Sequence, residues 1–135
     1  SSSGFTDMPM NHKVFLAQFD AIKKLASEGP CVMVGRCADY ALSEYKDCFS
    51  VFVHADTDWR INRLSQKHNK TAKEAKDMIN KTDKSRSSYY NYYTNKKWGA
   101  ASSYNLCVDS SKLGIDGAAK AIIQAIEIFD SIKNK

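Results

Sequence analysis

The sequence lacks several features that would place it in a specialised class of protein. Its four cysteines, Cys31, Cys37, Cys48 and Cys107, form no C-x-x-C pair, and its three histidines have no metal-binding spacing. No apolar run approaches the roughly 20 residues of a membrane-spanning helix, and no secretory signal is present. These absences argue against a disulfide framework, a metal site and a membrane protein. They favour reduced core thiols in a cytoplasmic protein.

What the sequence does contain is an ordinary globular composition with a local excess of positive charge. The 135 residues are 43% hydrophobic and 26% charged, which suits one domain with a real core. The net charge is +5, and lysines and arginines crowd between residues 60 and 97. An anionic partner and a solvated basic surface explain this crowding equally well.

Periodicity and turn residues predict alternating helices and strands within a single domain, residues 1–135. Residues 1–10 are interpreted as a loop or a non-native remnant, and Asn11 as the N-cap of the first helix. The capping box Thr71–Glu74 is expected to open a long helix toward Tyr93. The expected helices are 11–28, a short helix or turn at 37–45, one around 59–64, one from 71, and one at 116–132; the expected strands are 31–34, 49–53 and 104–108.

This order of elements predicts βαβ units and a parallel sheet covered by helices. The strands at 31–34 and 49–53 are continuous apolar runs, as in strands buried on both faces. Three strands are few for such a sheet, so part of the structure is expected to be missing. Ligands of such sheets bind at the carboxyl ends of the strands, where Arg36, Asp56 and Ser110 are placed.

Arginines at this edge are candidates for phosphate binding, because a guanidinium group forms bidentate bonds with phosphate. Arg36 follows the strand at 31–34 directly, with an ion pair to Asp39 as the alternative. Arg60 and Arg63 share one helix face and could neutralise charge in phosphoryl transfer, or simply face solvent.

Residues 81–98 combine five basic side chains, four tyrosines and a tryptophan, with Asp83 as the only acid. Cations bind phosphates and aromatic rings stack on bases, so a nucleotide or a nucleic-acid strand is indicated. Helical spacing would put Asp83, Arg86, Tyr90, Tyr93 and Lys97 on one face. The alternative is that the tyrosines pack against neighbouring elements, with Tyr89 and Tyr92 the candidates for structural roles.

Three motifs together resemble the cytidylate kinase-like family of P-loop nucleoside monophosphate kinases. They are Cys31–Tyr40, Lys81–Tyr93 and Tyr104–Gly114, which occur in the family's order. The resemblance implies a three-layer α/β/α parallel sheet and ATP-dependent, Mg²⁺-assisted phosphoryl transfer to a CMP-like acceptor. Residues 70–98 would form the lid and acceptor-binding segment. Cys37 departs from the family, which has an acid at that position.

The resemblance also implies a role for each candidate residue. Arg36, Lys81, Asp83 and Arg86 would bind the acceptor, with Asp83 orienting the nucleoside. Arg60 and Arg63 would be catalytic and stabilise the transferring group. Ser110, in the turn after the last strand, would contact the ATP. No metal ligand is assigned.

The sequence contains no Gly-rich loop ending in Gly-Lys-Ser/Thr, the motif that cradles ATP phosphates. We therefore expect an N-terminal strand and the P-loop to be missing, and the fragment itself to be inactive. A non-catalytic nucleotide-binding module and a nucleic-acid-binding module remain alternatives, nucleic acid being the less favoured. Apolar surface left by a missing strand could favour a homodimer.

Overall fold

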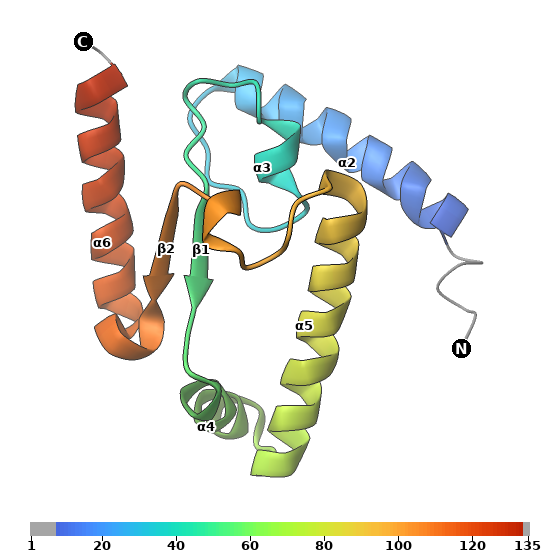
Figure 1. Ribbon diagram of the computed structural model, residues 1–135, viewed down its shortest axis with the longest axis vertical. Coiled ribbons are helices and arrows are strands. Elements are labelled where there is room, and N and C mark those ends of the chain that lie inside the picture. The colour runs from blue at the N-terminus through green and yellow to red at the C-terminus, as the bar shows by residue number, and fades with distance from the viewer. Residues whose placement is uncertain (1–7, 134–135) are drawn as a thin grey trace. The chain divides into compact units, whose positions relative to one another are not determined.

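The computed structural model describes the backbone of residues 8–133 and the side chains of residues 12–133 (Figure 1). The chain divides into two units, residues 1–48 and 49–135. The architecture is mixed α/β, mostly helical, with one small parallel sheet. Of the stretch expected to be a loop, residues 1–7 lie outside the described part and residues 8–10 are helical, so that expectation is wrong for its last three residues.

The first unit consists of helix α2 (Met8–Glu28) and the short helix α3 (Ala38–Ala41). Helix α2 begins before Asn11, which is therefore inside the helix and not its N-cap as predicted. The core of the unit joins one face of α2 to α3 and the following turn. Its buried members are Ile22, Ala38, Ala41 and Leu42, with Phe19, Ala26, Met33 and Cys48 packed against them.

The strand predicted at residues 31–34 does not form. These residues have no strand pairing, and the side chains of Val32 and Val34 are 92% and 89% exposed. A β-strand is defined by hydrogen bonds to a neighbour, and none of the described residues pairs with this segment. Residues 31–34 are apolar, but the prediction that they form a buried strand is wrong. Cys31 is likewise exposed, in contrast to the core position expected for it.

The second unit is organised around two parallel strands, β1 (Val51–His54) and β2 (Leu106–Asp109), side by side in Figure 1. Val51 pairs with Leu106 and His54 with Asp109, so the carboxyl ends of the strands are in register. Both strands confirm the predicted ones with shifts of one or two residues. Val53 is 51% exposed, however, so β1 is not buried on both faces as expected.

Aromatic side chains pack on both faces of the sheet. Phe49, just before β1, lies 5.3 Å from the ring of Phe129 in helix α6 (Ser110–Lys133). Phe52 contacts Trp98 at 5.2 Å and Tyr104 at 4.9 Å between ring centres. Because side chains alternate along a strand, these two groups occupy opposite faces. The sheet is thus held by α6 on one face and by the residues around the 3-10 turn Ala101–Ser103 on the other.

Helices α4 (Thr57–His68) and α5 (Ala72–Thr94) follow β1 and precede β2 along the chain. The two helices pack against each other. The predicted capping box is confirmed: Glu74 N–H donates to Thr71 Oγ1, and Thr71 N–H donates to Glu74 Oε1. It satisfies two donors that the helix start would otherwise leave unpaired. The box fixes the residue at which α5 begins.

Helix α6 begins with a short turn at Ser110, and the helix predicted at 116–132 follows Gly114 and is confirmed. The end of β2 caps the short first turn. Asp109 Oδ1 accepts a hydrogen bond from Ser111 N–H at 2.9 Å. Gly114, with φ of 72°, then interrupts the helical backbone with a kink. Of the residues expected to face the core, Ile122 and Phe129 are half-buried, whereas Ile126 is exposed.

Within residues 8–133, no helix combines the length and the apolar character that crossing a bilayer requires.

Candidate functional site

The most distinct polar cluster of the second unit joins α4 to α5. Arg60 Nη1 lies 2.7 Å from Asp83 Oδ2, and Arg60 Nη2 donates to Asp83 Oδ1 at 2.8 Å. Arg86, one turn further along α5, places its Nη1 3.8 Å from Asp83 Oδ1. The side chains of Arg60 and Asp83 are 31% and 24% exposed, whereas that of Arg86 is 61% exposed. Three of the predicted site residues are therefore brought together, with Arg86 facing solvent.

Two further predicted residues of this unit lie apart from the Arg60–Asp83 pair. Arg63 is exposed, and its guanidinium carbon lies 5.7 Å above the ring of Trp59. It lines a shallow hollow with Gln66 and Lys67, which gives that part of α4 a positive surface. Lys81 is exposed on α5. Both remain accessible to an anionic ligand.

The tyrosines at the end of α5 serve mainly in packing. Tyr90 and Tyr93 are 6% and 9% exposed, and the ring of Tyr93 lies within 5 Å of both Tyr89 and Tyr92. Tyr92 is 58% exposed, contrary to the structural role expected for it. Helix α5 ends at Thr94, so Lys97 lies beyond it and does not extend the predicted face. This packing weakens the interpretation of residues 81–98 as an open base-stacking strip.

Hydrogen bonds tie together the carboxyl ends of the two strands. Ser110, expected to contact ATP, is 4% exposed, and its hydroxyl donates to the carbonyl of His54 at 3.3 Å. The backbone N–H of Asp56 donates to Ser111 Oγ at 3.1 Å, and Ser111 Oγ in turn donates to Asp109. These bonds from Ser111 hold the pKa of Asp109 below its usual value. The edge is polar and rigid, and the hydroxyl of Ser110 is engaged within it.

In the first unit, Arg36 sits in a strained turn. Gly35, Arg36 and Cys37 have φ values of 71°, 59° and 55°, three consecutive left-handed residues. Such a conformation is easy for glycine but costs roughly 1–2 kcal/mol for each other L-residue. The turn is closed by the N–H of Ala38, which donates to the Gly35 carbonyl at 3.2 Å. Strain of this kind is concentrated at functional sites in proteins, and here it presents an exposed arginine.

Cys37 is the last residue of this turn; its side chain is buried, and its environment keeps the thiol neutral. Burial, with a smaller contribution from the charge of Asp39, raises the pKa of Cys37 to about 11. Asp39 Oδ1 also accepts the backbone N–H of Tyr40. Where the resemblance leads us to expect an acid, this chain therefore has an uncharged packing residue.

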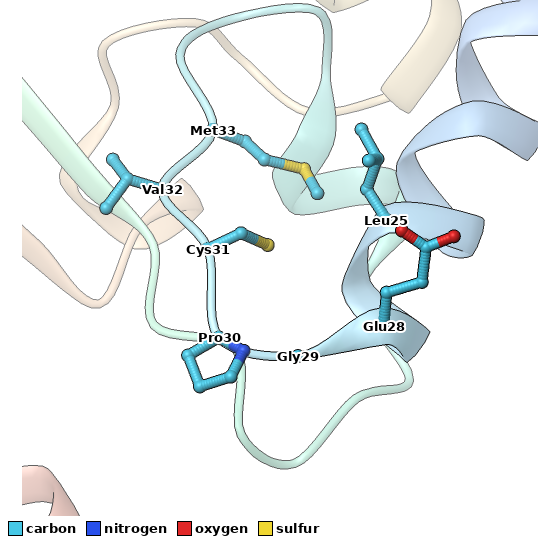
Figure 2. A pocket seen from close by; sticks show the side chains of 7 residues that line it. All are labelled: Leu25, Glu28, Gly29, Pro30, Cys31, Val32 and Met33. Carbon is cyan, nitrogen blue, oxygen red and sulfur yellow. The ribbon is translucent and has the colours of Figure 1, made fainter.

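A hollow of about 280 Å³ lies between the end of α2 and residues 29–33 (Figure 2). Its lining residues are Leu25, Glu28, Gly29, Pro30, Cys31, Val32 and Met33. Figure 2 shows the side chains of Cys31 and Met33 directed toward Leu25 and that of Val32 directed away. The segment thus keeps the alternation of a strand without strand pairing. The hollow is apolar apart from Glu28 and suggests no chemistry.

Reasoning from the sequence identified the arginines and Asp83 but missed the contact between Arg60 and Asp83. The two residues are 23 positions apart on different helices. The only sign of this contact in the sequence is that an arginine of α4 and an aspartate of α5 have opposite charges. Many other pairs of residues in this highly charged region have opposite charges as well. The aromatic packing of Phe52 was also missed, although Gly99 indicated a close approach: a Cβ atom there would lie 3.4 Å from the Phe52 ring.

Comparisons with known proteins give the family of the chain and a similar solved structure. Residues 1–112 match the sequence profile of the cytidylate kinase-like family. The crystal structure of an uncharacterized protein from Eubacterium ventriosum is similar, with a TM-score of 0.82 and 34% sequence identity. That similarity covers 84% of this chain and 65% of the other, so the chain spans less than two thirds of its length. No curated protein matches. The extent of the family match shows that the chain belongs to the cytidylate kinase-like family.

Proposed function

We propose that this chain supplies the acceptor-binding and lid parts of a kinase that transfers the γ-phosphoryl group of ATP to a CMP-like nucleoside monophosphate. The observation that carries the proposal is the Arg60–Asp83–Arg86 cluster, in a chain of the cytidylate kinase-like family. The finer fold belongs to the same proposal: a three-layer P-loop sheet, of which the parallel pair β1–β2 would be part.

In the proposed reaction an oxygen of the acceptor phosphate attacks the γ-phosphorus, and ADP leaves. The chemistry asks the protein chiefly for positioning and charge neutralisation. In the second unit the exposed Arg86 would bind the acceptor phosphate, with Lys81 as an additional cation. Arg36, exposed in the first unit, is proposed separately as a phosphate-binding residue. Arg60 and Arg63 would face the transferring group. A bidentate guanidinium grip fixes a phosphate in both position and orientation.

The residues present do not fit a protein-held Mg²⁺. Among the described residues, no group of three or more histidine, cysteine, aspartate or glutamate side chains could hold a metal ion. The proposal therefore assigns no metal ligand to this chain, and no step is derived through the ion. For ATP, the cationic side of α4 with Arg63 and Lys67 fits a polyphosphate in charge, whereas the buried Ser110 does not present a free hydroxyl.

The proposal is tested by titration calorimetry of the 135-residue chain with CMP, UMP and AMP. Arg36→Ala and Arg86→Ala should each weaken CMP binding about tenfold, the scale of a lost charge-assisted hydrogen bond. Lys84→Ala is the matched control, since Lys84 is exposed on the same helix as Arg86 and has no assigned role. Failure of the chain to bind CMP, or equal affinity of the arginine variants and wild type, would contradict the acceptor site. Tight, strongly salt-dependent oligonucleotide binding would favour a nucleic-acid module instead.

A further inference from the structure

Asp83, on α5, forms a bidentate ion pair with Arg60 of α4. Each of its carboxylate oxygens meets a different nitrogen of Arg60, at 2.7 and 2.8 Å, in an end-on bidentate pair. The pair is half-buried, and Arg86 approaches the same carboxylate from its exposed side. A carboxylate whose two oxygens are both bound by Arg60, with Arg86 3.8 Å away, is poorly placed to accept a hydrogen bond from a nucleoside hydroxyl. Its strongest interaction is with Arg60.

The same geometry leaves Arg60 with donors for a second anion. A guanidinium group has more N–H donors than one carboxylate can use, and an end-on pair leaves the edge that includes Nε–H. Asp83 restricts the long Arg60 side chain to one orientation, which removes part of the entropy cost of binding. Two cations and one anion leave the cluster with one net positive charge, so it still attracts an anion.

We infer that Asp83 is a positioning residue for Arg60: it fixes the guanidinium group so that Arg60 binds the transferring phosphate group next to the acceptor phosphate bound by Arg86. This deepens the proposed function and rests on it for the class of ligand, a phosphorylated compound. It changes the role of Asp83 from contacting the nucleoside to orienting a phosphate-binding arginine.

The test must separate positioning from charge, because removing a carboxylate increases anion binding by itself. Asp83→Glu keeps the charge and moves the carboxylate by one methylene group, so the end-on pair cannot form unchanged. The matched control is Asp77→Glu on the same helix, an exposed residue outside the cluster. Inorganic pyrophosphate is the probe for phosphate binding, and cytidine, which has no phosphate, is the probe for nucleoside binding.

Calorimetry should show pyrophosphate affinity about 3- to 10-fold lower in Asp83→Glu, the scale of freeing one long side chain, and unchanged in Asp77→Glu. Cytidine affinity should be the same in all of these variants. In an Arg60→Lys background, Asp83→Glu should have no further effect, since the bidentate pair is already lost. Thermal melts establish that each variant is folded, and the Arg60 Nε–H resonance should broaden in Asp83→Glu as the side chain gains freedom.

The outcomes distinguish this inference from the proposed function. Loss of cytidine affinity in Asp83→Glu, or an equal loss of pyrophosphate affinity in the wild-type and Arg60→Lys backgrounds, would overturn the positioning role. Absence of pyrophosphate binding in the wild type would overturn it as well. If Asp83→Glu weakens pyrophosphate binding only when Arg60 is present, and the chain fails to bind CMP, the inference is retained and the acceptor site of the proposed function is rejected.

Discussion

At the scale of single residues, exposure should control how fast each thiol of this chain reacts, and the raised pKa of Cys37 should slow that thiol further. Cys37 is 5% exposed with a pKa of about 11, whereas Cys31 is exposed beside the hollow of Figure 2. Because the thiolate is the reactive form, iodoacetamide at pH 7.5 should alkylate Cys31 first and Cys37 last. Peptide mass spectrometry at successive times measures the order.

The control for this order is the unfolded chain. In urea all four cysteines should react at similar rates, and in Cys31→Ser the fast phase of the native protein should disappear. Alkylation of native Cys37 as fast as Cys31 would mean that the turn Gly35–Cys37 does not bury the thiol as described.

The residue scale is also where sequence reasoning was weakest. Arg60 and Asp83 could each be identified as a candidate, because charged residues in a basic, aromatic region suggest an anionic ligand. Their bidentate contact depends on how α4 packs against α5, which no local pattern specifies. Likewise, a hydroxyl after a strand suggested that Ser110 binds ATP, whereas packing turned it toward the carbonyl of His54.

At the scale of elements, the capping box of α5 should contribute to stability in a pH-dependent way. Hydrogen bonds from Thr71, the backbone one first, lower the pKa of Glu74 from its usual value of 4.5. A carboxyl whose pKa is lowered by folding stabilises the protein fully above the unfolded value and loses this contribution as the pH falls through the folded value. Glu74→Ala should therefore destabilise the protein at pH 7 and much less at pH 3.

Urea unfolding at the two pH values measures this difference. Thr71→Ala removes the other half of the box and should cost about 1 kcal/mol, the usual loss for an N-cap. Asp77→Ala, which removes an exposed acid of the same helix, is the control. A Glu74→Ala effect of equal size at pH 3 would show that the box does not act through the ionised carboxylate.

Elements with local signals were predicted well, and elements that need a distant partner were not. Helix α5 has a complete start signal in Thr71–Glu74, so its position follows from the sequence. Residues 31–34 carry an apolar run typical of a buried strand, but pairing is a property of two segments. The run is extended and exposed here because none of the described residues supplies the second segment.

At the scale of the whole molecule, the sequence contains the proposed acceptor side of a kinase without a Gly-Lys-Ser/Thr loop. We expect the 135-residue chain, incubated with ATP, Mg²⁺ and CMP, to form no CDP, because the printed sequence has no Gly-Lys-Ser/Thr loop of the kind that cradles the donor phosphates. Chromatographic separation of the nucleotides measures this, with an active nucleoside monophosphate kinase as positive control. CDP formation that disappears in Arg86→Ala would contradict the expectation, and formation unaffected by that change would indicate a contaminating enzyme.

The parallel pairing of β1 with β2 has a consequence for how the chain comes to be folded. Val51 meets Leu106 only after an intervening stretch that contains α4 and α5, since the paired residues are 55 positions apart. Contacts at such separations form slowly, because a long loop must close before they are made. On the ribosome, α4 and α5 can therefore pack together before β2, the pairing partner of β1, has been synthesised. During that interval the strand is open to unwanted pairing, which makes translation speed after residue 54 relevant to yield.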